Sequence, residues 1–279
     1  MAKKRKKNAG MVFLTVPAYK SGMIYMNMKI REIKRQASYK LQGKLMTAML
    51  AMLLVTVSEV VGGRLASVLF GGEDWLSLIL GQIFVFIISL VTSVLSAGLC
   101  YMFLNMARGK EFSMGDLVFF FQNHPDRVIV AAFFLALINL IVSIPYYIYS
   151  LTAAAGETAV QQTNYLAGLL GFMVLSIVLN TIVTIPFAQT YYLMADQLNL
   201  EGIAALKESA AMMKGHFWNF FKLIASFVPS MILSVFTFYI ALLWVMPFLQ
   251  MSETVYYEML LEQKREETGI ISDQQTVTM

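Results

Sequence analysis

The chain has 279 residues, of which 58% are hydrophobic and 14% are charged, and its formal net charge is +4. Soluble domains average roughly 45–50% apolar and about 25% charged residues, whereas here the apolar residues fall in blocks of about 20 or more. This composition excludes a water-soluble globular protein and indicates a polytopic membrane protein. A single cysteine, Cys100, excludes a disulfide framework and a cysteine-rich metal site.

The first 44 residues hold most of the positive charge, with 12 Lys and Arg against one acid, while residues 45–279 hold 9 Lys and Arg against 16 acids. This basic stretch leads directly into an apolar segment, so its cations match the anionic headgroups of the inner leaflet, and no nucleic-acid partner is expected. Residues 1–27 are predicted to form a disordered basic tail. The apolar run 11–19 contains Pro17 and lacks a small-residue cleavage site, which argues against a signal peptide.

An amphipathic helix is predicted from Lys29 to Lys44, because Ile30, Ile33, Ala37 and Leu41 recur at helical spacing. We expect this helix to lie at the membrane interface with its cationic stems reaching the surface. A solvated helix that obeys the positive-inside rule is the alternative. The residues predicted to contact anionic lipid headgroups are Lys29, Arg31, Lys34, Arg35, Lys40 and Lys44.

Six apolar segments follow, each long enough to cross about 30 Å of hydrocarbon as a helix. They predict an all-α membrane helix bundle at residues 28–260, followed by a polar cytoplasmic tail at 261–279. The segment 75–106 exceeds the bilayer thickness and is expected to project from it. The predicted spans are 45–65, 75–106, 128–149, 166–193, 217–238 and 239–260.

The connecting segments predict the orientation. Segments 107–127 and 194–222 carry six Lys and Arg residues, whereas segments 66–74 and 150–165 carry none. Because Lys and Arg are retained on the cytoplasmic side, both termini are expected to be cytoplasmic in a multi-pass protein of the cell membrane.

A second amphipathic helix is predicted between the fourth and fifth spans, from Asn199 to Gly215. Its stripe consists of Leu200, Ile203, Leu206, Ala210 and Met213. We expect it to lie along the inner surface of the membrane. Lys214 in its last turn and His216 just after it are candidates for contact with a lipid phosphate; a structural helix cap is the alternative.

Polar residues within the spans define a candidate intramembrane site, because an unpaired charge at that depth costs several kcal/mol. Glu253 is the principal candidate and Glu59 the second. One interpretation is a proton or cation site lined also by Asn139, Asn180 and Gln189. The alternative is that the carboxylates reach a polar interface while the amides tie helices together.

No catalytic residue, metal site or cofactor is predicted. The two histidines lack clustered partners and do not form a zinc motif, and the sequence contains no Walker loop and no Gly-x-Ser-x-Gly elbow.

Several segments resemble domain of unknown function 975, a family of bacterial integral membrane proteins found mainly in Firmicutes. The resemblance covers about residues 28–260 and implies six helices with no established activity. Its most specific part is the Ser-x-x-x-Met-Lys-Gly-His segment, Ser209 to His216. The segments that carry the resemblance are 29–37, Ala107-Arg108-Gly109, Ile185-Pro186, Ala195-Asp196 and 208–218.

The sequence alone favours a non-enzymatic membrane scaffold or accessory protein that contacts anionic lipid or a membrane or cytoplasmic protein partner. A small transporter with an intramembrane carboxylate is the alternative, and an enzyme acting on lipid headgroups is a third candidate. A polar cavity at membrane depth distinguishes the transporter from the scaffold, since a scaffold does not need one.

Overall fold

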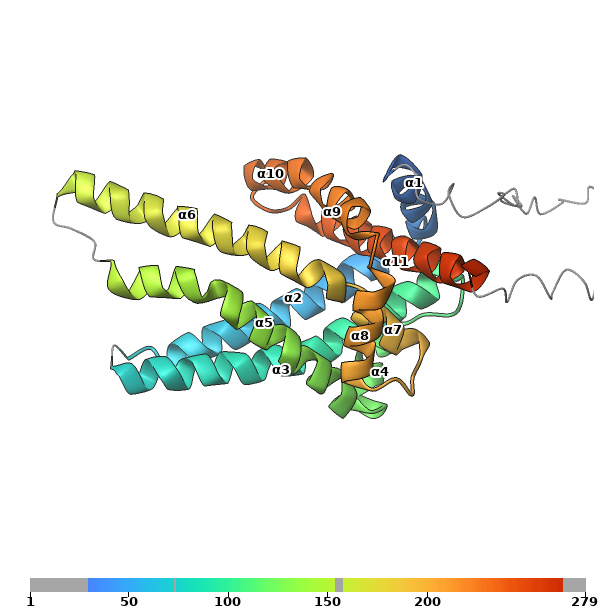
Figure 1. The fold of residues 1–279 in the computed structure, drawn as a ribbon, viewed down its shortest axis with the longest axis horizontal. Coiled ribbons are helices and arrows are strands. Elements are labelled where there is room, and N and C mark those ends of the chain that lie inside the picture. The colour runs from blue at the N-terminus through green and yellow to red at the C-terminus, as the bar shows by residue number, and fades with distance from the viewer. Residues whose placement is uncertain (1–29, 73, 154–157, 268–279) are drawn as a thin grey trace, which may run out of the picture.

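The computed structural model describes residues 30–72, 74–153 and 158–267, and in these ranges the chain is helical and contains no strand. Two long helical hairpins extend away from a cluster of shorter helices (Figure 1). This arrangement confirms the predicted all-α bundle. The predicted tail at 1–27 and the residue Lys29 lie outside the described ranges.

Five helical segments among the described residues are long and apolar enough to cross a membrane. They correspond to the first five predicted spans and extend most of them by several residues, because flanking residues continue the helices beyond the apolar blocks. The five segments are Leu45–Leu69, Trp75–Ala107, Pro125–Thr152, Ala159–Asp196 and Phe217–Phe236.

The first hairpin pairs α2 (Leu45–Leu69) with α3 (Trp75–Ala107). Asp74 caps α3, since its carboxylate accepts a hydrogen bond from the Ser77 amide at 3.0 Å. The 33 residues of α3 make it about 50 Å long, so it extends beyond a bilayer core of about 30 Å, as predicted.

A short connection joins α3 to the second hairpin through a 3₁₀ turn (Met114–Val118) and α4 (Phe119–Gln122). The turn packs directly on Gly98 of α3, where the carbonyl group of Leu117 occupies the space that a side chain would need. The second hairpin pairs α5 (Pro125–Thr152) with α6 (Ala159–Thr184).

The fourth span is interrupted after α6. A 3₁₀ turn at Ile185–Phe187 precedes α7 (Thr190–Asp196), because Pro186 cannot donate a backbone hydrogen bond. The buried Ser209 hydroxyl of α8 (Gly202–Met212) serves both sides of the break: it donates to the Pro186 carbonyl at 2.9 Å and accepts from the Gln189 amide at 3.2 Å.

The fifth span is divided into α9 (Phe217–Ala225) and α10 (Val228–Phe236), with Pro229 in the first turn of α10. A tight turn with left-handed φ angles at Phe238 and Tyr239 leads to α11 (Leu242–Glu267). The sixth predicted span is therefore helical, but α11 is not among the five segments apolar enough to cross, because it carries several charged residues from Glu253 onwards. It also continues past residue 260, where the span was predicted to end.

Both amphipathic helices form, and most residues of their apolar stripes pack on protein, although Ile203 of α8 is 45% exposed. Ile33, Ala37 and Leu41 of α1 (Ile30–Leu41) are buried, and α1 packs mainly against α11. Likewise, α8 lies across the bundle and buries Leu206 against its neighbours (Figure 1). The buried part of each stripe therefore belongs to the protein core, and the location of both helices at the membrane interface stays a prediction.

The core is concentrated at one end of the bundle, where α1, α7 and α8 surround α3 and α11; we call this the packed end. At the opposite end, the open end near Leu69 and Thr152, large apolar side chains remain exposed on α2, α3, α5 and α6. Soluble monomers rarely expose apolar patches larger than a few hundred Å², so this surface fits contact with lipid.

Candidate functional site

A cavity of about 540 Å³ lies between the second hairpin and helices α3, α9 and α11. Ser93 lies 14 residues before the end of α3, and Asn139 lies 14 residues after the start of α5, so both are about 21 Å from the packed ends of their helices. The two antiparallel helices thus place the cavity at the same depth, within the apolar spans.

Three residues of the predicted intramembrane site, Glu253, Asn139 and Asn180, line this cavity together. Four hydroxyl groups accompany them. Each donates its hydrogen to a carbonyl group three or four residues earlier in its own helix, which leaves the oxygen lone pairs available to accept bonds. The hydroxyl residues are Ser89, Ser93, Thr181 and Thr184.

The Glu253 carboxylate has no hydrogen bond and no ion pair within the described residues, and the described lining contains no Lys, Arg or His. An unpaired charge away from water is costly, so the group must take up a proton, hold water or bind a cation. The hydrogen-bond acceptors that line the cavity fit bound water or a bound cation.

A hydrogen-bond network on the adjacent turn positions Glu253. Gln250 donates its side-chain amide to the Tyr192 hydroxyl at 2.7 Å, and the Thr254 hydroxyl lies 3.1 Å from the same oxygen. Tyr192 and Thr254 are fully buried. This contact fixes α11 against α7 and therefore fixes the direction from which Glu253 enters the cavity.

The other predicted members of the site lie elsewhere. Gln189 is fully buried, and its side-chain amide has no hydrogen-bond partner in the described structure, but it does not line the cavity. Glu59 lies on the exposed surface of α2. The cavity thus unites three of the five predicted residues.

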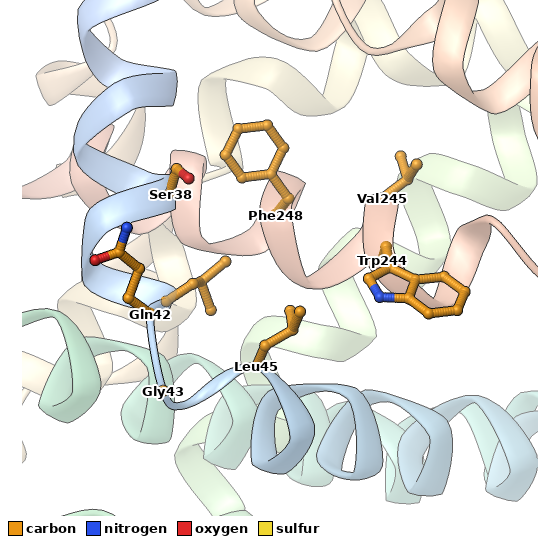
Figure 2. Close-up of a pocket in the computed structure, with 8 residues that line it drawn as sticks. Ser38, Gln42, Gly43, Leu45, Trp244, Val245 and Phe248 are labelled. Atoms are coloured by element: carbon orange, nitrogen blue, oxygen red, sulfur yellow. The ribbon is translucent and has the colours of Figure 1, made fainter.

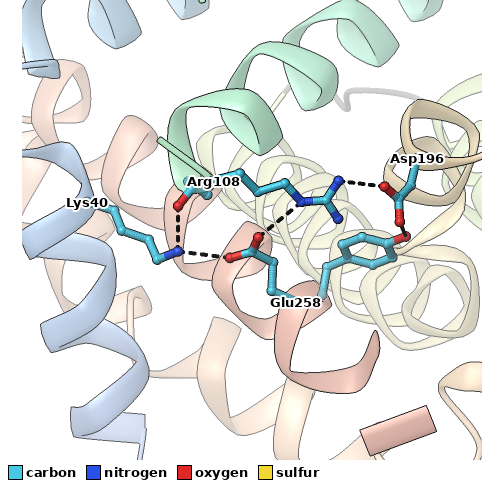
Figure 3. Close-up of polar contacts among 6 residues, drawn as sticks. Lys40, Arg108, Asp196 and Glu258 are labelled. Carbon is cyan, nitrogen blue, oxygen red and sulfur yellow. Dashed lines mark hydrogen bonds and ion pairs between the residues drawn. The ribbon is translucent and has the colours of Figure 1, made fainter. Parts of the chain in front are cut away.

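An ion-pair network closes the packed end (Figure 3). Arg108, at the end of α3, contacts Asp196 of α7 at 2.5 Å and Glu258 of α11 at 3.3 Å. Lys40 of α1 adds a contact to Glu258 at 2.9 Å. Burial acts to lower the pKa of Arg108, but the hydrogen bond and charge of Asp196, aided by Glu258, outweigh it and raise the pKa, so the guanidinium remains charged.

Three lysines predicted to contact lipid headgroups bind carbonyl groups at helix C-termini. The ammonium group of Lys40 donates to Ala107 at 2.6 Å, and that of Lys44 donates to Met106 at 2.9 Å, both at the end of α3. Lys34 donates to Ser226 after α9 at 3.0 Å. These carbonyls lie at the C-terminal ends of their helices, where the helix dipole favours a cation.

Of the other described residues predicted to contact lipid headgroups, three are exposed and one is partly buried. Arg31 and Arg35 are exposed on α1, where Arg35 pairs with Glu32, and Lys214 is exposed after α8. The backbone carbonyl of His216 accepts a hydrogen bond from the Tyr256 hydroxyl at 3.1 Å. His216 thus contributes to helix packing through its main chain.

A second, more apolar pocket of about 440 Å³ lies where α1 turns into α2 at Gly43 (Figure 2). Its walls are mainly apolar, with Ser38 of α1 and Gln42 just after α1 at one side and aromatic residues of α11 at the other. The lining residues are Ser38, Leu41, Gln42, Gly43, Leu45, Trp244, Val245 and Phe248. No ionisable side chain lines it within the described residues.

The helical fold, the apolar exterior and the internal polar cavity together define an α-helical membrane protein. The model of the family described as "protein of unknown function (DUF975)" matches residues 26–264, and the chain belongs to this family. This confirms the resemblance carried by the sequence segments. No curated protein and no solved structure matches the chain.

Sequence reasoning did not identify the Arg108 network or the hydroxyl residues of the cavity. One signal was present: Arg108 and Asp196 each lie beside small residues in segments that carry the family resemblance. Their pairing across 88 residues depends on the meeting of the C-terminal ends of α3 and α7, which periodicity does not reveal.

Proposed function

We propose that this membrane protein is a carrier that binds a small cationic solute in the cavity at Glu253. The single observation that supports this function is an unpaired carboxylate facing a cavity whose described lining has no basic side chain. A scaffold needs no such cavity, so its presence favours the transporter interpretation over the scaffold that the sequence alone favoured.

The helices around the cavity have features that a carrier needs. α6 has no buried residue and packs chiefly on α5, so the second hairpin is held to the rest of the protein mainly by α5. The breaks at Pro186 and between α9 and α10 lie beside the cavity lining. Such breaks let one part of a bundle move against another while the binding residues stay in place.

Binding can be tested with a hydrophobic carbodiimide, a reagent that modifies protonated carboxyl groups in apolar surroundings. In lipid nanodiscs we expect the reagent to modify Glu253, and we expect one of a panel of K⁺, choline and putrescine to protect it. The variant E253Q abolishes this modification, while E59Q, which removes a carboxylate outside the cavity, retains it. Absence of modification at Glu253 would contradict the proposal.

Transport can be tested in proteoliposomes that contain a pH-sensitive dye. If Glu253 exchanges a proton for the cation, adding the protecting cation outside changes the internal pH in the wild type and in E59Q but not in E253Q. An unchanged signal in E253Q refutes transport through this site.

A second candidate function is attachment to anionic lipid or to a protein partner through the packed end. The specific observation is that Arg31 and Arg35 are exposed on α1, on the same side as Ser38 and Gln42 of the second pocket. This arrangement offers a phosphate-binding charge beside an apolar groove. We expect the double variant R31A/R35A to copurify with less anionic phospholipid than K222A, which removes an exposed lysine of α9; equal amounts contradict this candidate.

A further inference from the structure

The cavity at Glu253 opens sideways rather than towards an end of the bundle. Two of its lining residues, Ser89 and Asn139, are exposed although they lie about 27 and about 21 Å from the packed ends of α3 and α5. Exposure at this depth places the opening on the flank of the apolar spans.

The surface around the opening is apolar. On α5, Leu140 is 44% exposed, and on α6, Ile182 is 37% exposed, each one or two residues from a polar lining residue. Because α6 has no buried residue, its lining residues Asn180 and Thr181 belong to a helix whose other faces meet the surroundings of the protein. A molecule that enters here comes from the hydrocarbon phase.

The lining restricts the chemistry of that molecule. One carboxylate and a set of oxygen acceptors favour a positive charge, whereas a phosphate group would meet Glu253 with no described Lys, Arg or His to balance it. Phe187, Phe220 and Tyr191 add aromatic rings to the wall, and aromatic faces attract quaternary ammonium groups. The volume of about 540 Å³ lies within the range of pockets that hold drug-sized ligands.

We propose that the ligand of this cavity is a lipophilic organic cation without a phosphate group, which enters from the lipid phase between the two hairpins and places its ammonium group at Glu253. This inference rests on the proposed function, since it names the substrate class and the entry route of the same site. The hydrocarbon part remains at the opening, among the exposed apolar residues of α5 and α6.

The inference can be tested by protection of Glu253 from the hydrophobic carbodiimide in phosphatidylcholine nanodiscs. The probes share parts of one structure: dodecyltrimethylammonium has the ammonium head and a tail, tetramethylammonium has only the head, and dodecanol has only the tail. We expect dodecyltrimethylammonium to protect at a total concentration at least tenfold lower than tetramethylammonium, and dodecanol not to protect. Dodecylphosphocholine, which adds a phosphate, should also fail to protect.

A substitution at the opening tests the route by which the ligand enters. L140W places a large side chain beside the opening without changing a lining residue, and we expect it to weaken protection by dodecyltrimethylammonium at least fivefold while tetramethylammonium behaves as in the wild type. L151W, at an exposed position near the far end of α5, is the matched control and should behave as the wild type. Thermal unfolding of each variant in the same nanodiscs verifies that it is folded.

The outcomes separate the two proposals. If tetramethylammonium protects as well as dodecyltrimethylammonium, the site binds cations but the lipid-phase route is refuted and the proposed carrier function stands. Equal protection by dodecanol refutes the ammonium contact at Glu253. If no cation protects, including the water-soluble panel, both the substrate class and the carrier function are refuted.

Discussion

Arg108 and Asp196 form an ion pair of 2.5 Å that joins the end of α3 to the end of α7, and each side chain keeps only about a fifth of its surface exposed. Glu258 shares the same guanidinium group from α11. The Arg108 guanidinium therefore joins three helices that belong to distant parts of the chain, and its removal leaves the Asp196 and Glu258 carboxylates without this cation.

We expect R108A to lower the free energy of unfolding by about 2 kcal/mol, between the values typical of exposed and of fully buried pairs. Thermal unfolding in detergent or nanodiscs measures the change. R35A removes an exposed pair within α1 and should change stability by less than about 0.5 kcal/mol. Equal effects of the two variants would show that the Arg108 network adds no stability.

Gly98 allows the turn at Leu117 to lie directly against α3, and a Cβ atom there would overlap the Leu117 carbonyl group. We expect G98A to destabilise the protein by about 1–3 kcal/mol, because the turn or the helix must shift. Gly63 of α2 has nothing within 4 Å of an added Cβ atom, so G63A is neutral or stabilises slightly through helix propensity. Similar melting temperatures for both variants would argue against this close approach.

The Ser209 side chain hydrogen-bonds to both sides of the break between α6 and α7. S209A leaves the Pro186 carbonyl and the Gln189 amide without that hydroxyl, and we expect a loss of about 1–3 kcal/mol. S38A, at an exposed position of α1, serves as the control. A stability loss in S38A as large as that in S209A would rule out a specific role for the bond.

Burial lowers the pKa of the Lys34 ammonium group from its ordinary value of 10.5. The folded protein therefore releases this proton at lower pH than the unfolded chain, so the contribution of Lys34 to stability increases as pH rises through the lowered pKa towards 10.5. We expect the melting temperature of the wild type minus that of K34M to increase as pH is raised over that interval. A difference that is constant or shrinks with pH contradicts this sign.

The spans were predictable because hydrophobic blocks of sufficient length leave little choice of structure in a bilayer. The breaks were not, since proline alone does not decide them: Pro145 and Pro247 lie within continuous helices, whereas Pro186 lies at a break. Pro186 differs from them in that its carbonyl group accepts a hydrogen bond from the Ser209 hydroxyl. That hydroxyl belongs to another helix, so a local sequence pattern does not reveal the contact.

The candidate site was predictable in part for a similar reason. Polar residues at membrane depth tend to face one another, and Glu253, Asn139 and Asn180 do line one cavity. The lysines of α1 were harder to place, because a cation beside an apolar stripe fits lipid phosphates and helix C-termini equally well. The structure assigns Lys40 and Lys44 to the carbonyl groups at the end of α3, a contact that depends on where α3 ends.

The uneven distribution of the core has a mechanical consequence. Ion pairs and buried aromatic rings join several elements at the packed end, whereas at the open end each hairpin is held chiefly by its own two helices. In a bilayer, the separation of the two hairpins at the open end would therefore depend on the lateral pressure of the lipid as well as on contacts within the protein.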